Sequence, residues 1–580
     1  MSKENYVSKK KKITVISLSA IFLVALVVAV TVGVNLHHSS SSDDDKSNNN
    51  LSATMKAIKL ICQPTDYKEE CVKSLSSEAG NTTDSKELIK AAFKAAMDHI
   101  NEAAKKSNVL KELEKDPRAK KALDSCKELM DSSTDEFKNS FDQLGDFDAT
   151  KIDELLNDLR IWLSAAITYQ ETCLDAFQNT TGDAGEKMRA ALKSAMQMSS
   201  NSLAIVSDLS KVLSNFNFPS LGRRLLEHDV PVLGHGELYP DWFNDIPGSR
   251  RLLAASPAQI KPDVTVAKDG SGQFKTINEA LPLIPKKSNK TFVIYIKEGV
   301  YQEYVELNKS MTHVMMIGDG PHKTRITGNR NFVDGIPTFK TSTVGVSGDY
   351  FIAKNIGIEN TAGAEKHQAV ALKVQSDFSA FYNCSFDGYQ DTLYAHTKRQ
   401  FYRDCTISGT IDFVFGDSAA VFQNCTFVVR KPLDNQQCIV TAQGRKDRRQ
   451  PSAIIVTDSK IVADPALYPV RFQRKVYLGR PWKEFSRSII MKTHLDDLIQ
   501  PEGWSPWLGN FGINTCFYTE FQNRGPGSNT TRRVKWRGIK TITSQHALDF
   551  TPGRFLLGDS WIKATGVPYY PGFLNETEKV

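Results

Sequence analysis

The sequence contains no Gly-x-Ser-x-Gly motif, the sharp turn on which many hydrolases hold a nucleophilic serine. It also contains no His/Asp cluster with the spacing of metal ligands. From residue 263 onward, no long helical pattern alternates with the short β-like runs, which argues against a Rossmann fold or a TIM barrel. A serine hydrolase and a metal-dependent hydrolase are therefore disfavoured, and we expect neither a metal nor a cofactor.

Residues 13–34 lack charge entirely and are rich in Val, Leu, Ile and Ala, whereas the four residues before them are lysines. A stretch of this length can span a bilayer, and its basic flank favours a cytoplasmic N-terminus. Because it is long for a cleaved signal peptide, we predict a cytoplasmic tail and signal anchor over residues 1–35, with signal cleavage as the alternative. In both cases the rest of the chain enters the secretory pathway, and the precursor contacts a membrane through residues 13–34.

The formal charge is mildly positive, +7 at pH 7. It fits simple solubility, or attraction to a polyanion such as an acidic polysaccharide; we predict no nucleic-acid partner.

The nine cysteines agree with an oxidising compartment, and at least one of them is unpaired or bonds between chains. Their spacing suits a hairpin closed by Cys62 and Cys71, and two helices joined by Cys126 and Cys173. Asn-x-Ser/Thr sequons that permit glycosylation include those at Asn81, Asn179, Asn289, Asn308, Asn529 and Asn575.

A polar tether is predicted over residues 36–52 and a helical domain over residues 53–218, where aromatic residues are few and Ala, Lys, Glu, Ser and Leu are common. The clearest apolar stripe has steps of four and three residues, as on one face of a helix, and consists of Ile89, Phe93, Ala96, Ile100 and Ala103. Similar stripes occur at residues 155–176 and 188–213. Several such helices joined by short polar loops predict an up-down four-helix bundle.

Residues 219–260 break the helical pattern with Pro, Gly and charge, and contain Arg-Arg-Leu-Leu twice. The alternatives are a charged linker and a pair of protease sites between two domains. Two copies of one motif in the linker of a secretory protein favour processing, with a protease as partner. The predicted processing residues are Arg223, Arg224, Arg250 and Arg251.

A short phrase occurs three times after the linker, in the domain predicted over residues 261–580. Phe381-Tyr-Asn-Cys384 returns as Phe401-Tyr-Arg-Asp-Cys405 and as Phe422-Gln-Asn-Cys425. A fixed period in short β-rich segments predicts a parallel β-solenoid. In such a coil, residues one period apart stack on neighbouring turns, about 4.8 Å apart.

Two aspartates keep the same step, Asp391 and Asp412, so the repeat places two carboxylates side by side. At that distance they would repel by roughly 3 kcal/mol, so one should hold a proton while the other stays ionised. The alternative is that both are ordinary turn residues. Gln368 and Gln390 lie about one turn apart and could stabilise an oxyanion. The segment Leu478-Gly-Arg480-Pro-Trp482 offers a guanidinium for a carboxylate and a flat ring for a sugar, although Trp482 could equally be a core residue.

These residues resemble plant pectin methylesterases, and the resemblance covers about Asp263 to Asn575. The helical part resembles the pectin methylesterase inhibitor family through the segments Cys62–Cys71 and Trp162–Cys173. The order of the parts and the linker are those of a proenzyme with an inhibitor-like pro-region. The enzyme motifs are Asp263–Phe274, Ile294–Tyr301, Gly388–Tyr394, Gly409–Gly416 and Leu478–Trp482.

The resemblance implies a right-handed parallel β-helix that hydrolyses methyl esters of galacturonate units in pectin, releasing methanol. In this reading Asp412 is the nucleophile, and Asp391 is first the acid and then the base. The other implied site residues are Gln368 and Gln390 for the oxyanion, Arg480 for orienting the nucleophile, and Trp482 and Thr338 for the substrate.

The resemblance further implies a pro-region that masks the cleft until cleavage, action in the extracellular plant cell wall, and a separate inhibitor protein as a further partner. Among the aligned thiols we favour a Cys405–Cys425 disulfide, with Cys384–Cys405 as the geometric alternative, since stacked positions lie within disulfide Cα range. Cys438 and Cys516 remain unassigned.

Two other functions are considered. A pectin-cleaving glycosidase could also use two aspartates, but inverting hydrolysis requires carboxyl groups about 6.5–9.5 Å apart, more than adjacent turns provide. A non-enzymatic inhibitor or wall-binding protein would act through the helical part.

The implied site raises one difficulty of strand geometry, because Gln390 and Asp391 would point to opposite faces of a regular strand. If both line the cleft, the strand must bend or end there.

Overall fold

The computed structural model describes residues 46–145, 152–209 and 261–574. The predicted anchor over residues 13–34 and the linker with its two dibasic motifs lie outside these ranges. Within the described ranges, no helix is long and apolar enough to cross a membrane. Helix α2 begins at Lys46, inside the stretch predicted to be a polar tether.

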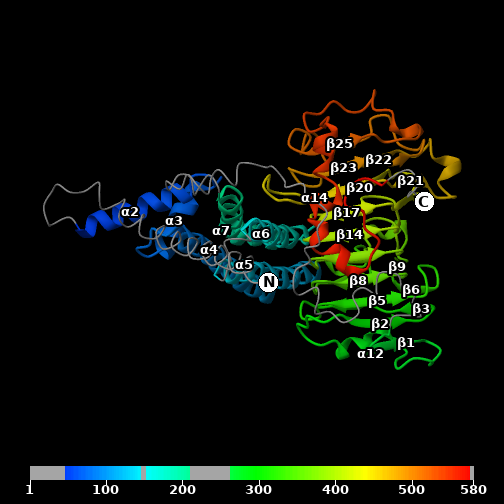
Figure 1. The fold of residues 1–580 in the computed structure, drawn as a ribbon, viewed down its shortest axis with the longest axis horizontal. Helices are drawn as coiled ribbons and strands as arrows, with labels where there is room; N and C mark the ends of the chain where they lie inside the picture. The colour runs from blue at the N-terminus through cyan, green and yellow to red at the C-terminus, as the bar shows by residue number, and fades with distance from the viewer. Residues whose placement is uncertain (1–45, 146–151, 210–260, 575–580) are drawn as a thin grey trace, which may run out of the picture.

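The N-terminal part is entirely helical (Figure 1). Helix α4 packs against α5 and α7, and α6 packs against the same two helices. All five residues of the predicted apolar stripe are buried on α4, which begins where Asp84 accepts hydrogen bonds from the amides of Lys86 and Glu87. The helices are α2 (Lys46–Ile61), α3 (Lys68–Glu78), α4 (Ser85–Leu113), α5 (Pro117–Gly145), α6 (Ile152–Asp175) and α7 (Ala184–Ser207).

Both disulfides predicted for the helical part are confirmed. Cys62 and Cys71 close the loop between α2 and α3, with their Cα atoms 5.8 Å apart. Cys126 and Cys173 join α5 to α6, with their Cα atoms 4.5 Å apart. The second bond closes a loop of 47 residues and fixes α6 against its neighbour, which matters because α6 also contacts the C-terminal domain.

The C-terminal part is a parallel β-helix whose successive coils contribute strands to three sheets; every strand pairing within the described sheets is parallel. The ten-stranded sheet contains β1 (Val264–Val266), β2 (Phe292–Ile296), β5 (Val314–Gly318), β8 (Ile352–Lys354), β11 (Ser379–Tyr382), β14 (Arg399–Arg403), β17 (Ala419–Gln423), β20 (Ala453–Thr457), β23 (Arg487–Met491) and β25 (Phe517–Phe521). The eight-stranded sheet contains β3 (Gly299–Gln302), β6 (Thr324–Gly328), β9 (Gly357–Asn360), β12 (Ser385–Asp387), β15 (Thr406–Gly409), β18 (Thr426–Val429), β21 (Lys460–Ala463) and β24 (His494–Leu495). The seven-stranded sheet contains β4 (Val305–Leu307), β7 (Val344–Val346), β10 (Leu372–Val374), β13 (Leu393–Ala395), β16 (Val414–Gly416), β19 (Cys438–Gln443) and β22 (Val476–Gly479).

The sequence repeat corresponds to successive coils. Phe381 pairs with Tyr402, and Tyr402 pairs with Phe422, so the aromatic residues of three copies form one column. Their rings stack inside the coil with centroids 4.7 and 4.4 Å apart. Such stacked aromatic rings add to the burial energy of the core and fix the register of the coils.

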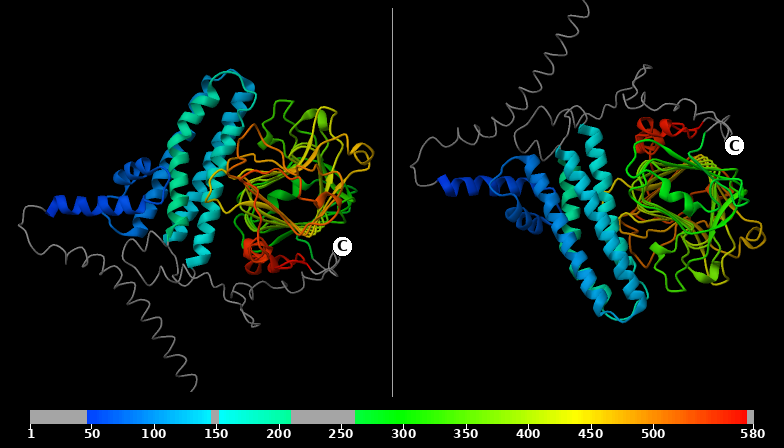
Figure 2. Two further views of the ribbon diagram at one scale, coloured as in Figure 1. Left: turned by 90° about the horizontal axis from the view of Figure 1, so that it is seen from above. Right: turned by 90° about the horizontal axis from the view of Figure 1, so that it is seen from below.

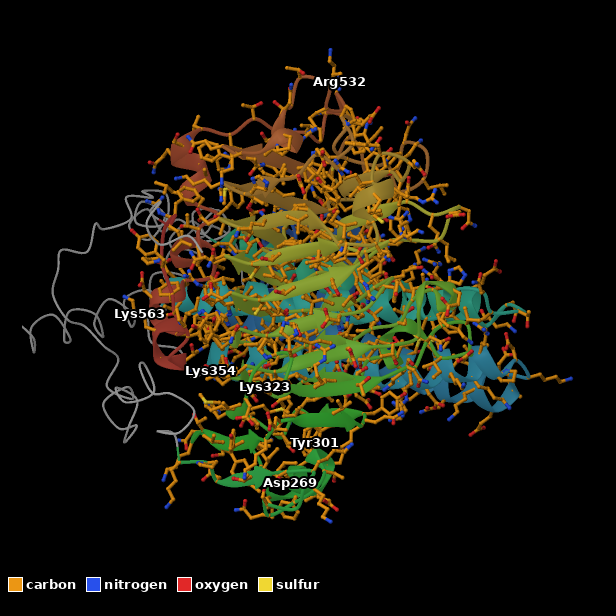
Figure 3. All side chains as sticks on the ribbon, turned by 90° about the vertical axis from the view of Figure 1, so that its right-hand side faces the viewer. Asp269, Tyr301, Lys323, Lys354, Arg532 and Lys563 are labelled. Carbon is orange, nitrogen blue, oxygen red and sulfur yellow. A yellow bond between two sulfur atoms is a disulfide. The ribbon has the colours of Figure 1, made fainter. Side chains whose placement is uncertain are left out.

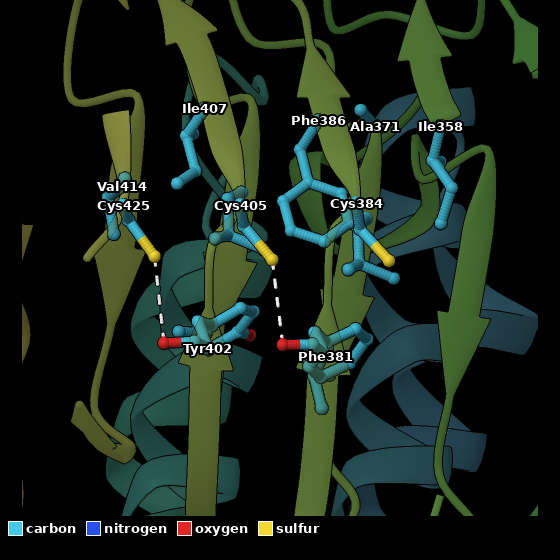
Figure 4. Close-up of a cluster of buried hydrophobic side chains, with 14 of the residues drawn as sticks. Ile358, Ala371, Phe381, Cys384, Phe386, Tyr402, Cys405, Ile407, Val414 and Cys425 are labelled. Carbon is cyan, nitrogen blue, oxygen red and sulfur yellow. Dashed lines mark hydrogen bonds between the residues drawn. The ribbon is translucent and has the colours of Figure 1, made fainter. Parts of the chain in front are cut away.

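The predicted Cys405–Cys425 disulfide is wrong, and its alternative Cys384–Cys405 is not formed either: all three thiols are free and buried. Figure 4 shows their side chains running parallel, with the Cys405 thiol donating to the Phe381 carbonyl and the Cys425 thiol to the Tyr402 carbonyl. Parallel side chains keep the Cβ atoms about one strand spacing apart, roughly 4.8 Å, whereas a disulfide needs about 3.8 Å. The Cα spacing was compatible with a bond, but the side-chain direction is not.

The helical domain lies against one side of the β-helix, and α6 is among the helices at the boundary (Figures 1 and 2). On another side of the β-helix, the C-terminal segment packs over the outer face of the ten-stranded sheet. That segment includes α13 (Ser544–Leu548) and α14 (Pro552–Phe555), and a further short helix, α12 (Ile277–Ala280), lies near the first coil.

Candidate active site

The two aspartates of the repeat lie where the chain enters the seven-stranded sheet. Asp391 is two residues before Leu393, and Asp412 is two residues before Val414, and these two strand residues pair with each other. The carboxyl groups therefore belong to neighbouring coils, and both line one cavity of about 190 Å³. The side chains are almost fully buried, with Asp391 7% and Asp412 4% exposed.

A bend in the backbone resolves the difficulty over side-chain alternation. Asp391 and Asp412 have φ angles of 63° and 51°, in the left-handed region. This conformation costs a non-glycine residue about 1–2 kcal/mol, so it persists only where the surrounding structure imposes it. Because the strand begins only after the bend, Gln390 and Asp391 both face the cavity.

Arg480 binds the carboxylate of Asp412 in a bidentate manner. Its Nε lies 2.8 Å from Oδ1 and its second terminal nitrogen lies 2.5 Å from Oδ2. The guanidinium in turn lies over the ring of Trp507, 4.2 Å from its centroid. Charge-assisted paired bonds of this kind fix both the orientation and the ionised state of a carboxylate.

The surroundings of the two carboxyl groups act differently on their pKa values. Burial raises the pKa of Asp391 well above its usual range, and the nearby charge of Asp412 raises it further. Burial also raises the pKa of Asp412, but the charge and hydrogen bonds of Arg480 oppose that rise. When the pair carries a single proton, the proton belongs on Asp391 and the negative charge on Asp412.

Two amide side chains complete this end of the cavity. The backbones of Gln368 and Gln390 pair as a single parallel β-bridge between adjacent coils. The backbone amide of Ala369 donates a hydrogen bond to the backbone carbonyl of Gln390 at 3.1 Å. Thr338 begins a short 3-10 helix and also lines the cavity. The cavity therefore brings together every substrate and catalytic residue proposed from the sequence: Thr338, Gln368, Gln390, Asp391, Asp412, Arg480 and Trp482.

Two stacked aromatic rings that the sequence analysis did not single out form an apolar wall beside Trp482. Tyr394 and Phe415 are stacked with centroids 4.1 Å apart, and each meets the edge of Trp482, at 6.4 and 5.8 Å. Both rings follow their aspartate by three residues, so the period that aligned the aspartates also predicts the stack. Trp507 had no such signal, because it comes from a loop outside the repeat. The further lining residues from the β-helix are Phe339 and Ala442.

The helical domain supplies the remaining wall of the cavity, through the end of α6 and the residues after it. Thr172 Oγ1 lies 2.8 Å from Nε2 of His396, whose ring is 4.5 Å from that of Tyr394. Thr168 donates to the buried carboxylate of Asp417 at 2.6 Å. The lining residues from this domain are Thr172, Asp175, Ala176 and Gln178.

Both parts of the chain match families of known proteins. Residues 263–559 match the pectinesterase family, and residues 56–205 match the plant invertase/pectin methylesterase inhibitor family. The protein named "Probable pectinesterase/pectinesterase inhibitor 21" from Arabidopsis thaliana is 54% identical over 98% of this chain and 83% of its own length. "Pectinesterase 3" from Phaseolus vulgaris is 44% identical over 88% of this chain and 86% of its own. The solved structure of pectin methylesterase from carrot is 47% identical, with a TM-score of 0.54, and covers 55% of this chain and 100% of its own.

The fold and these relatives define a carboxylic ester hydrolase built on a parallel β-helix. The chain belongs to the pectinesterase family and carries an N-terminal domain of the pectin methylesterase inhibitor type. The carrot structure is matched over its whole length by 55% of this chain, the share that the β-helix domain occupies.

Proposed function

We propose that Asp412 is the nucleophile of the esterase and Asp391 its acid and base. A carboxylate oxygen of Asp412 attacks the ester carbonyl of a methylated galacturonate, and the amides of Gln368 and Gln390 stabilise the tetrahedral oxyanion. The bond from the carbonyl carbon to the methoxy oxygen then breaks, and Asp391 donates its proton to that oxygen, which leaves as methanol. The observation that carries this proposal is the bidentate Arg480–Asp412 contact beside a buried carboxyl with a raised pKa.

The second half of the reaction restores the site. Asp391, now ionised, takes a proton from water, and the water oxygen attacks the carbonyl carbon bound to Asp412. Breaking that bond releases the free galacturonate and returns Asp412 to its carboxylate form. Arg480 keeps Asp412 oriented throughout, while Trp482 and Thr338 position the polysaccharide.

We further propose that the helical domain inhibits the enzyme within the same chain. The proposal is supported by four residues of that domain in the cavity wall, and by ion pairs along the boundary. Lys398 contacts Glu136 at 2.8 Å, and Arg399 contacts Asp158 at 2.6 Å. A polysaccharide chain could not pass through the cavity while α6 occupies this position.

The wider account is also a proposal. Cleavage at the dibasic motifs, including Arg250 and Arg251, would free the β-helix for action on pectin in the plant cell wall, after passage through the secretory pathway with residues 13–34 as a membrane anchor. A separate inhibitor protein could then bind where α6 lay. We take the coils to be right-handed and α4 to α7 to form an up-down four-helix bundle.

The test is methanol release from methylated pectin by the full chain before and after cleavage of its linker. A matched chain in which Arg223, Arg224, Arg250 and Arg251 are all replaced by Gln controls for cleavage elsewhere. We expect slow release before cleavage and a large increase after it. Equal rates before and after cleavage would contradict inhibition by the helical domain.

A further inference from the structure

Lys483 connects the wall of the active-site cavity to the helical domain. It follows Trp482, which lines the cavity, and its ammonium lies 5.2 Å from the centroid of that ring. The ammonium donates to Asp175 at 2.7 Å and to Glu171 at 3.1 Å, both on α6. Across residues 46–145, 152–209 and 261–574, these two are its only carboxylate partners in ion pairs.

The neighbouring Lys446 provides a contrast. It lies 3.7 Å from Glu171, but it also pairs with Glu484 of the β-helix domain at 2.8 Å. When the helical domain leaves, Lys446 therefore keeps an anionic partner and Lys483 loses both of its own. The side chain of Lys483 is only 13% exposed in the closed chain, so departure of α6 opens an unpaired ammonium beside Trp482.

The partner that Lys483 loses occupies the substrate's space. Asp175 lines the same cavity as the two aspartates of the site. One of its oxygens binds Lys483, while the other is buried without a hydrogen-bond partner. The Asp175 side chain thus brings a carboxylate into the cavity beside Lys483 and Trp482. A de-esterified galacturonate carries a carboxylate that could take the place of Asp175 on Lys483, and a sugar face that could lie against the Trp482 ring.

We propose that Lys483 is a subsite for a free galacturonate carboxylate, filled by Asp175 and Glu171 in the uncleaved chain and by de-esterified pectin in the cleaved enzyme. The proposal rests on the function proposed above. Each hydrolysis converts a neutral ester into a carboxylate, so the enzyme creates the ligand of this subsite. A chain that already holds free galacturonate then binds in preference to a fully methylated one, which favours attack next to units already hydrolysed.

The test uses the chain cleaved in its linker and separated from its helical domain. The measurement is kcat/KM on a partly de-esterified oligogalacturonide divided by kcat/KM on the fully methylated oligomer. K483Q removes the charge and K483R keeps it. K323Q is the matched control, because Lys323 is exposed on the face turned away from the helical domain (Figure 3).

We expect K483Q to lower this ratio about fivefold, the effect of losing one partly exposed ion pair, and to weaken competitive inhibition by de-esterified hexagalacturonate similarly. K483R should retain the ratio, and K323Q should match the wild type. A K483Q ratio equal to the wild type, or K483R falling as far as K483Q, would overturn the subsite. Failure of the esterase assignment would be seen separately, as a wild-type enzyme that releases no methanol from the fully methylated oligomer.

Discussion

Arg480 holds both oxygens of the Asp412 carboxylate, at 2.8 and 2.5 Å, while Asp391 on the neighbouring coil is buried with a raised pKa. The two carboxyl groups come from equivalent positions of the repeat, yet one is paired with a cation and the other is not. This asymmetry is the basis of the roles that we propose for them, because a nucleophile must be ionised and an acid must carry a proton.

Replacing Arg480 should disturb this division directly. In R480Q the pKa of Asp412 is expected to rise, since burial then acts without the opposing cation. We expect kcat to fall by about 100-fold at neutral pH, and the acidic limb of the pH profile to move to higher pH. The measurement is methanol release by the cleaved enzyme between pH 4 and 9. An unchanged acidic limb in R480Q would contradict the role given to Arg480.

The wild-type enzyme should show a bell-shaped pH dependence. In the proposed mechanism Asp412 must be ionised, so activity should be lost as the pH falls through the pKa of that residue. Asp391 must be protonated, so activity should also be lost as the pH rises through the elevated pKa of that residue. In D391N the alkaline limb should disappear from the residual activity. Retention of the same alkaline limb would assign it to another group.

Attachment of the helical domain should weaken as the pH rises. Asp417, which binds Thr168 of α6, has its pKa raised to about 6 by burial. Departure of α6 removes part of this burial and so lowers the pKa of Asp417. Its protonation therefore favours the closed state at low pH, and that contribution is lost as the pH rises through about 6. Chains cleaved in the linker should therefore separate more readily at pH 7 than at pH 5, as measured by gel filtration. D417N should reduce this pH dependence, and a wild-type complex tighter at pH 7 would contradict it.

The pairs between α6 and Lys483 should help keep the uncleaved chain inactive. The double variant E171Q/D175N leaves the ammonium of Lys483 buried without an anion, which typically costs 3–5 kcal/mol. We expect the uncleaved variant to release methanol at least about tenfold faster than the uncleaved wild type. E87Q is the control, because Glu87 pairs with Lys90 on α4, away from the cavity. Equal rates in the double variant and the wild type would show that these pairs do not contribute to closure.

The number of free thiols can be measured directly by titration of the denatured protein. Denatured, unreduced protein should contain five titratable thiols, from Cys384, Cys405, Cys425, Cys438 and Cys516. A bond between any two members of the cysteine column would lower the count to three. The remaining four cysteines form the two disulfides of the helical domain and should appear only after reduction.

The sequence predicted features that recur locally. The repeat encodes the stacking of coils, and therefore the neighbouring positions of Asp391 and Asp412, because the register of a parallel coil follows directly from its period. It did not predict the direction of the cysteine side chains, since a period gives the Cα spacing and not the Cβ vectors. The left-handed backbone at Asp391 was anticipated only as a need for the strand to bend.

The sequence does not predict features that depend on how the helical domain packs against the β-helix. Asp175 and Thr172 reach the cavity only because α6 packs against a domain more than 200 residues away in the chain. No periodicity in α6 distinguishes residues that face its own domain from those that face another, because both sets are buried. Trp507 was missed for a related reason, since its contact with Arg480 joins a non-repeated loop to the site.

The central claim is that Asp412 attacks the ester, and the D412N variant tests it most directly. Methanol release from methylated pectin by the cleaved enzyme should fall by at least about 1,000-fold in D412N, with the thermal unfolding midpoint showing that the domain is folded. A folded D412N enzyme that releases methanol at the wild-type rate would contradict the account.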